Sequence, residues 1–122
     1  MNCNDNSQPL DVEKLKAQFQ QCWSSDSSSR WTPENPSRGQ CNVTTLVIQD
    51  HYGGEILKTP VDGQWHFYNR IADQVVDLTA EQFAILPNYL DLPSNRNESL
   101  AGTTAKRYAA LSRRFNQVRE QA

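Results

Sequence analysis

The stretch of sequence that decides the fold runs from residue 55 to residue 78 and reads EILKTPVDGQWHFYNRIADQVVDL. Residues 55–61 and 64–71 have the composition of strands, and Asp62-Gly63 between them is typical of a two-residue hairpin turn. A third strand is expected over residues 75–78, after a second short turn. The stretch therefore predicts a small antiparallel sheet of about three consecutive strands.

Two helices are predicted before this sheet. The first begins at Asp11, where apolar residues recur at helical spacing, and it ends at the serine-rich residues 24–29. The second runs from about Gln40 to Tyr52, and Gly53-Gly54 ends it. Its β-branched residues would also fit a strand. The double glycine and the turn that follows favour the helix.

The segment after the sheet is predicted to hold a short helix, a long loop and a final helix. Thr79-Ala80-Glu81-Gln82 has the pattern of a capping box, so a short helix is expected there. Residues 87–102 are rich in Pro, Asn and Ser and are expected to form a loop, and residues 104–120 a helix. Together these elements predict an α+β fold.

Length, charge and cysteine content narrow the class of protein. At 122 residues we expect one α+β domain over residues 10–122, preceded by a flexible N-terminus over residues 1–9. The net charge of −2 argues against a nucleic-acid binder, although residues 103–122 carry five basic residues and one acidic residue. The sequence shows neither a membrane span nor a signal peptide, and three cysteines do not suit a disulfide scaffold. We expect a cytoplasmic protein that binds no nucleic acid and no membrane.

Cys41 is the candidate nucleophile. A reactive cysteine needs a setting that stabilises its thiolate, such as the N-terminus of a helix or a neighbouring imidazolium. Cys41 lies at the start of the second predicted helix, just after a loop that contains Gly39. The partial positive charge of a helix N-terminus would favour the thiolate there.

His66 and Asp77 lie on consecutive predicted strands and are the candidates for base and orienting acid. If the turn between these strands has two residues, residue 70 pairs with 73 or residue 71 with 74. Either register puts Asp77 on the same face of the sheet as His66, opposite His66 in the first and opposite Tyr68 in the second. A three-residue turn would put Asp77 on the other face.

Three interpretations of these residues stay open on the sequence. A Cys-His-Asp triad would catalyse acyl transfer, with no cofactor. Cys41, His66 and Asp77 could instead be structural, in a binding or regulatory domain whose triad is vestigial. The same three residue types could also ligate a metal such as zinc or iron with one position open.

Several motifs together resemble the YunG-like family of small bacterial proteins. The similarity covers about residues 19–116 and is carried by Trp31-Thr-Pro-Glu-Asn-Pro36, Gly39-Gln40-Cys41, Asp50 with Gly53-Gly54-Glu55-Ile56-Leu57, His66-Phe67-Tyr68-Asn69-Arg70, Val76-Asp77-Leu78-Thr79-x-x-Gln82-Phe83, and Arg107-Tyr108 with Leu111. More distantly, a cysteine on a helix followed by His and Asp on strands is similar to the papain-like and transglutaminase-like superfamily. The resemblance implies a papain-like core and a thiol site, but it implies no substrate.

The distant resemblance also implies an oxyanion hole, which in that superfamily joins the N–H of the nucleophile to a side-chain amide shortly before it. Asn35 and Gln40 are the residues here that could supply this amide, with Asn35 preferred because a neighbour of the nucleophile tends to point away. Trp31 and Trp65 are candidates for the pocket wall. The expected activity is that of an amidase, peptidase or deamidase acting on a small amide or a protein side-chain amide.

Overall fold

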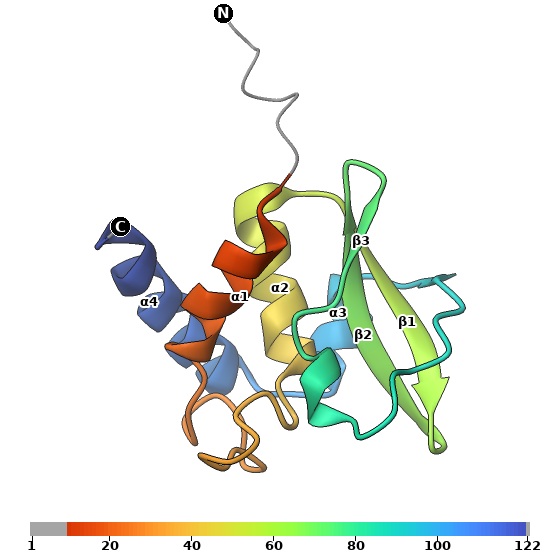
Figure 1. Cartoon of the computed structure of the whole chain (residues 1–122), viewed down its shortest axis with the longest axis horizontal. Coiled ribbons are helices and arrows are strands. Elements are labelled where there is room, and N and C mark those ends of the chain that lie inside the picture. Colours follow the sequence, from red (N-terminus) through yellow and green to blue (C-terminus); the bar gives the residue numbers. More distant parts are fainter. Residues whose placement is uncertain (1–9, 122) are drawn as a thin grey trace, which may run out of the picture.

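The structure is a computed structural model that describes residues 10–121, so the predicted flexible residues 1–9 lie outside the described residues. It shows a mixed α+β fold in which helices pack beside a four-stranded antiparallel sheet (Figure 1). The described elements, in chain order, are α1 Val12–Gln20, α2 Cys41–Tyr52, β1 Glu55–Val61, β2 Gln64–Ile71, β3 Gln74–Val76, the 3-10 helix η2 Ala80–Gln82, β4 Leu92–Pro93, α3 Arg96–Ala101 and α4 Ala105–Glu120. The α+β class expected from the sequence is confirmed.

The order of strands in the sheet is β3-β2-β1-β4, and the predicted hairpins form its centre. Val61 pairs with Gln64 across the Asp62-Gly63 turn, and Ile71 pairs with Gln74. The second pairing is one of the two predicted registers, because it leaves a two-residue turn. Asp62 and Gly63 have positive φ angles of 51° and 80°, and Ala72 and Asp73 have 49° and 67°, as tight hairpin turns require.

The sequence prediction was wrong in two places after the second strand. The third strand ends at Val76 rather than at residue 78. The expected capping box does not form, because the Thr79 side chain makes no cap hydrogen bond and the helix that follows is one 3-10 turn. The Thr79 backbone N–H and hydroxyl instead donate to Asp77 Oδ1, at 3.2 and 3.3 Å. A short polar side chain can satisfy neighbouring groups in this way instead of capping a helix.

The loop expected over residues 87–102 is also wrong in part, because it contains β4 and α3. Asn95 caps α3 by accepting a hydrogen bond from the Glu98 N–H at 2.9 Å. Ser99, which is buried, donates to the Asn42 carbonyl of α2 at 3.0 Å. These contacts, together with the ion pair of Arg96 with Asp50 at 3.0 Å, fix the segment to α2.

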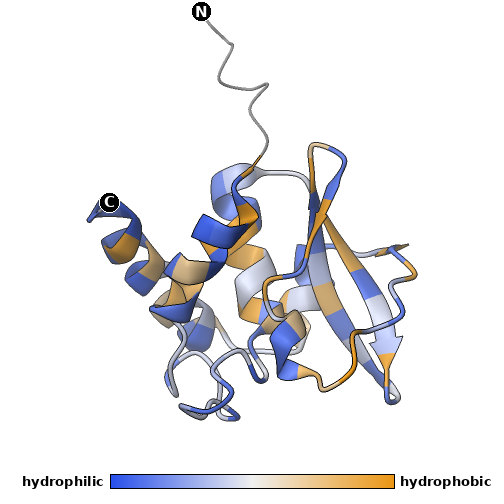
Figure 2. Ribbon diagram, viewed as in Figure 1, coloured by the Kyte–Doolittle hydropathy of each residue, from blue (hydrophilic) through white to orange (hydrophobic). Residues whose placement is uncertain are grey.

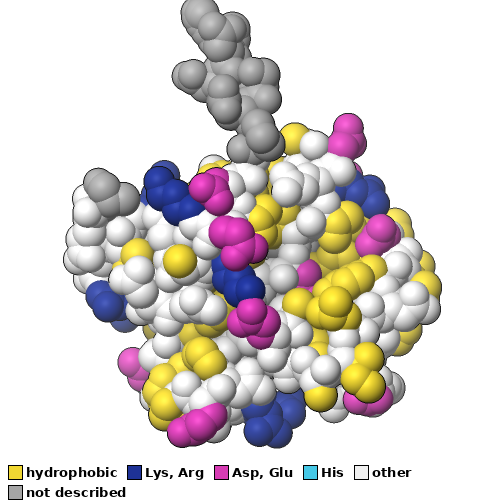
Figure 3. All heavy atoms as spheres, viewed as in Figure 1, with side chains coloured by type: hydrophobic (Ala, Val, Ile, Leu, Met, Phe, Trp, Pro, Cys, Tyr) yellow, Lys and Arg dark blue, Asp and Glu magenta, His cyan; other side chains and the backbone are white. Residues whose placement is uncertain are grey.

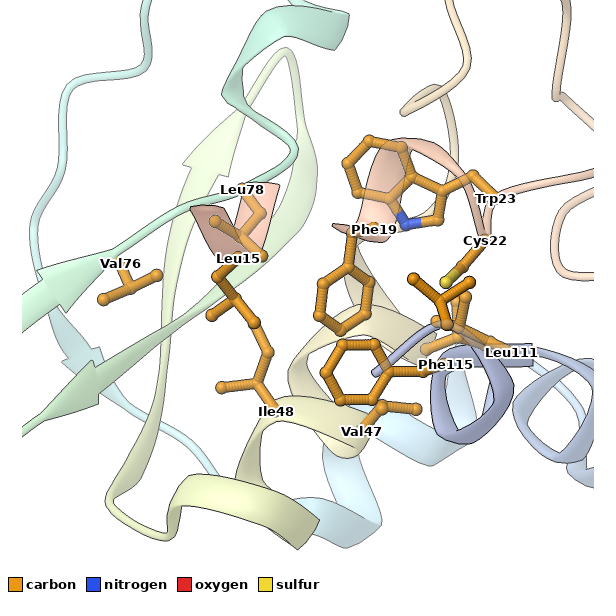
Figure 4. Close-up of a cluster of buried hydrophobic side chains, with 12 residues drawn as sticks. Leu15, Phe19, Cys22, Trp23, Val47, Ile48, Val76, Leu78, Leu111 and Phe115 are labelled. Atoms are coloured by element: carbon orange, nitrogen blue, oxygen red, sulfur yellow. The ribbon is translucent and has the colours of Figure 1, made fainter. Parts of the chain in front are cut away.

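The main core lies between α1, α2 and α4. Apolar residues alternate with polar ones around α1 and α4, so each helix turns an apolar stripe toward its neighbours (Figure 2). Phe19 of α1 and Phe115 of α4 stack with their ring centroids 4.5 Å apart, and Leu15 and Val47 lie beside them (Figure 4). A second, smaller cluster joins α2 to the sheet and comprises Cys41, Leu46, Ile56 and Phe67. The first residue of α2 is therefore held between the helix and the strands.

Apolar side chains are also exposed on the side of the molecule that the sheet occupies (Figure 3). Ile85 and Leu86, just after η2, are 85% and 69% exposed, and Trp65 is 47% exposed. Among residues 10–121 there is no helix of the length and apolarity that crossing a membrane would need.

Candidate functional site

His66 and Asp77 meet across the β2–β3 hairpin. Nε2 of His66 lies 2.7 Å from Oδ2 of Asp77, and the two side chains are 2% and 7% exposed. The contact follows from the register, because Asn69 pairs with Val76 and Asp77 thus comes opposite Tyr68, diagonal to His66 on the same face. Two residues that the sequence placed on one face are in hydrogen-bond contact.

The Asp77 carboxylate is held by more than the histidine. Its Oδ1 accepts both hydrogen bonds from Thr79, and its Oδ2 accepts a third from the Tyr89 hydroxyl at 2.6 Å. Burial and the bond to Asp77 raise the pKa of Tyr89, so its hydroxyl remains a donor throughout the physiological range. The carboxylate is thereby fixed in position while it faces the imidazole, as an orienting acid requires.

Cys41 is the first residue of α2, and it lines the same cavity as His66. The preceding Gln40 makes no side-chain cap hydrogen bond, so the first N–H groups of the helix have no cap side chain. Cys41 is 8% exposed, and its Sγ donates to Oδ1 of Asn42 at 3.4 Å. Nδ1 of His66, the ring nitrogen not bound to Asp77, is buried and has no hydrogen-bond partner among residues 10–121.

The surroundings of His66 favour its charged form. Burial by itself lowers the pKa of His66, but the hydrogen bond to Asp77 and the neighbouring Cys41 thiol raise it by more. The net result is a rise of the pKa from 6.5 to about 9. Phe83 lies edge-on to the ring at 4.9 Å between centroids, and Tyr68 stacks on it at 5.9 Å. His66 is thus an imidazolium near neutral pH, within an aromatic enclosure.

Cys41 and His66 line one cavity, of about 580 Å³. Its other walls come from the loop before α2, the β1–β2 hairpin and η2, and include Asn35, Trp65, Gln82 and Phe83. Cavities that hold small ligands in proteins usually measure about 300–1,000 Å³. The cavity is therefore large enough for a small substrate or for one side chain of a larger one.

Gln82 is a site residue that the sequence interpretation missed. Its Oε1 accepts a hydrogen bond from the Gly39 N–H at 3.2 Å, which fixes the orientation of the amide. Its Nε2 is buried and makes no hydrogen bond to residues 10–121, although Gln82 lines the cavity. The only signal in the sequence was Gln82-Phe83 within the family motifs, because Gln82 is 41 positions after Cys41 and no local pattern links them.

The four residues proposed for the oxyanion hole and pocket wall lie in different places. Asn35 lines the cavity, and its Nδ2 donates to the Gln82 carbonyl at 3.3 Å. Gln40 is buried away from the cavity, with its Nε2 donating to the Ser24 carbonyl at 3.3 Å. Trp31 packs against the main core, whereas Trp65 forms part of the cavity wall, with Lys58 Nζ 4.2 Å from its ring centroid.

A metal site at Cys41, His66 and Asp77 has no support in this geometry. Within the described part of the chain, no three His, Cys, Asp or Glu side chains are grouped so as to hold a metal ion. Nε2 of His66 is hydrogen-bonded to Asp77, and both Asp77 oxygens already accept other bonds. The arrangement suits an acid–base pair better than a ligand set.

Comparison with known proteins shows the family of the chain. The model of the family described as YunG protein matches residues 11–120, and the chain belongs to this family. The chain is also similar to a protein of Bacillus subtilis (strain 168) named Uncharacterized protein YunG, with 48% identity over 114 residues that cover 90% of this chain and 99% of that one. No solved structure matches the chain.

Proposed function

We propose that this protein is a thiol-dependent acyl-transfer enzyme that acts on an amide through Cys41, His66 and Asp77. The observation that carries the proposal is the buried His66–Asp77 pair at 2.7 Å, on one side of a cavity that Cys41 also lines. A buried pair of this kind beside a cavity, with one pKa strongly raised, is typical of catalytic sites.

In the proposed reaction the Cys41 proton resides on Nδ1 of His66 before the substrate is attacked, and Asp77 stabilises this imidazolium through Nε2. The thiolate attacks the carbonyl carbon of the amide, and the tetrahedral adduct collapses as the C–N bond breaks. The leaving amine takes the proton from His66, which leaves a thioester on Cys41. Water or an acceptor amine then attacks the thioester and restores the thiol.

Gln82 supplies one of the hydrogen bonds to the oxyanion in this proposal, and the Cys41 backbone N–H supplies the other. A donor that is aimed at the site before the reaction stabilises charge that develops in the transition state. Gln82 fits this role because its Nε2 is buried without a partner among residues 10–121 and its Oε1 is fixed by Gly39. Asn35 lies in the same cavity wall, and its amide is hydrogen-bonded to the Gln82 backbone.

A papain-like relationship forms part of the same proposal. Cys41 at a helix start, followed by His66 on β2 and by Asp77 directly after β3, supports it. The order of the three residues along the chain and the helix-then-sheet connectivity are what the distant resemblance implies.

The test is peptide-resolved alkylation by iodoacetamide near neutral pH. Cys22 is a matched internal control, because it is buried and burial raises the pKa of its thiol to about 11, despite a smaller opposing effect of Arg114. We expect Cys41 to react at least about tenfold faster than free cysteine and the variant His66→Gln to remove this advantage. Cys22 should stay slow in both proteins.

A binding domain with a vestigial triad is the second candidate, and the 8% exposure of Cys41 and its hydrogen bond to Asn42 favour it. It predicts that Cys41 reacts no faster than free cysteine and that His66→Gln changes nothing. That outcome would refute the enzymatic proposal.

A further inference from the structure

Two arginines line the cavity that holds the proposed nucleophile. Arg30 and Arg38 both contribute to its wall, and both are exposed. Within residues 10–121 neither guanidinium makes a hydrogen bond or an ion pair, whereas Arg70 and Arg96 both do. The chain thus places two cations beside Cys41 without giving them a described carboxylate partner.

The backbone segments that carry these arginines are fixed to each other. The Ser28 hydroxyl, which is buried, accepts from the Arg30 N–H and donates to the Arg38 carbonyl, both at 3.1 Å. Gly39 has a φ angle of +72°, and a Cβ there would lie 2.5 Å from Ser28 Oγ and 3.1 Å from Arg30 Cβ. The close approach needs glycine, so the two arginines stand on one rigid piece of loop next to Cys41.

The charges around the cavity favour a ligand with a single negative charge. Among residues 10–121, Asp62 on the β1–β2 turn is the only carboxylate that lines it, and the remaining polar lining residues outside the triad are neutral amides. Outside the triad, two guanidinium groups and one carboxylate leave one positive charge to be balanced. Guanidinium groups bind carboxylates through paired, charge-assisted hydrogen bonds.

From these contacts we propose that the substrate is a small amide whose non-reacting part carries a carboxylate, which Arg30 and Arg38 bind. This inference rests on the proposed function, because it assumes that the acyl group reacts at Cys41. It adds the substrate class, an amide of an amino acid or a similar carboxylate, which the triad alone does not specify.

The test uses two electrophiles of nearly equal size, N-chloroacetylglycine and its neutral analogue N-chloroacetylglycinamide. In both, the Cys41 thiolate displaces chloride and forms a thioether, so only the distal carboxylate differs. We expect the anionic probe to bind about tenfold more tightly than the neutral probe, because charge-assisted hydrogen bonds contribute on this scale. The maximal rates of alkylation should be equal for the two probes. A third probe, with a phosphonate in place of the carboxylate, should bind less well than the carboxylate.

The double variant R30Q/R38Q should remove the preference for the anionic probe while the neutral probe reacts as before. Glutamine keeps the side-chain carbons as far as Cδ, including the Arg30 atoms that pack on Gly39. The control is K106Q/R113Q, which removes two exposed positive charges of α4 that lie outside the cavity. It should leave the preference unchanged.

The possible failures are distinct. If Cys41 reacts rapidly with both probes at equal affinity, the carboxylate inference is overturned and the proposed function stands. If the phosphonate binds best, the monoanion assignment is overturned. If K106Q/R113Q abolishes the preference as R30Q/R38Q does, the preference comes from the overall charge of the protein, and the assignment of the carboxylate to Arg30 and Arg38 is wrong. If Cys41 reacts with neither probe, the proposed function fails and this inference fails with it.

Discussion

The ion pair of His66 with Asp77 predicts how the stability of the protein depends on pH. The pKa of His66 is raised from 6.5 to about 9 in the folded protein, against the opposing effect of burial, by the hydrogen bond to Asp77 and by the Cys41 thiol. The folded state therefore holds the proton more tightly than the unfolded state does. The stabilisation is fully present below about pH 6.5 and is lost as the pH rises through about 9.

The size of this effect follows from the difference between the two pKa values. One pKa unit corresponds to about 1.4 kcal/mol, so a rise from 6.5 to about 9 corresponds to about 3 kcal/mol. The His66 side chain is only 2% exposed, so solvent screens the pair little. A loss of this size is a large fraction of the free energy of unfolding of a small domain, about 5–15 kcal/mol.

Urea unfolding followed by tryptophan fluorescence measures this contribution. The free energy of unfolding of the parent protein is compared with that of His66→Gln at several values between about pH 6 and about pH 9.5, which span the two pKa values. Groups whose titration does not depend on His66 cancel in the difference. We expect the advantage of the parent protein to shrink by about 3 kcal/mol over this range, most steeply midway between the two pKa values.

His51→Gln is a matched control. Burial and Arg119 lower the pKa of His51, against a smaller opposing effect of Asp50, so its neutral form is favoured in the folded protein. Its effect has the opposite sign: His51 lowers the stability at acid pH, and this disadvantage is gone above about pH 6.5. A difference between the parent protein and His66→Gln that does not change with pH would refute the ion pair. A direct NMR titration of the His66 ring should give the same answer.

Three further outcomes follow from the site and from the sheet that carries it. Tyr89→Phe removes a hydrogen bond to the Asp77 carboxylate and should lower the free energy of unfolding by about 1–2 kcal/mol in urea, while a neutral result would mean that water replaces the hydroxyl. Gly54→Ala should lower the melting temperature far more than Gly53→Ala, because a Cβ at Gly54 would lie 2.2 Å from the Arg70 carbonyl whereas nothing lies within 4 Å of one at Gly53. Gln82→Glu keeps an acceptor for the Gly39 N–H but loses the amide donor. It should slow acylation of the protein by p-nitrophenyl acetate by about 10²–10³-fold and slow alkylation by iodoacetamide, which forms no oxyanion, much less. An equal effect on both reactions would show that Gln82 is not part of the oxyanion hole.

The hairpins and the meeting of His66 with Asp77 could be predicted from the sequence because they depend on local chemistry. Asp62-Gly63 fixes the first turn. A two-residue second turn fixes the register of the two strands that it joins, and the register determines which of their residues lie on the same face of the sheet. The start of α2 near Cys41 could also be predicted, because the loop before the helix and Gly53-Gly54 after it mark its two ends.

Gln82, Tyr89 and Asn42 could not be predicted in the same way. Each contacts the site from a segment whose position depends on tertiary packing: η2, the loop before β4, and the face of α2 that meets α3. Gln40 shows the converse case. Its place next to Cys41 in the sequence suggested a role in the site, but its amide turns toward Ser24 because a residue adjacent to the nucleophile in the helix N-terminus points away from it.

The proposed activity requires that Cys41 and His66 share one proton as a thiolate and an imidazolium. The ultraviolet absorbance of the thiolate measures this directly, as the difference between the parent protein and Cys41→Ser, in which Cys22 and Cys3 cancel. We predict thiolate absorbance at pH 7 that disappears in His66→Gln. The contrary result would be no thiolate absorbance at pH 7 and its appearance only near the pKa of a free thiol, about 8.5, in both the parent protein and His66→Gln. That result would contradict the account.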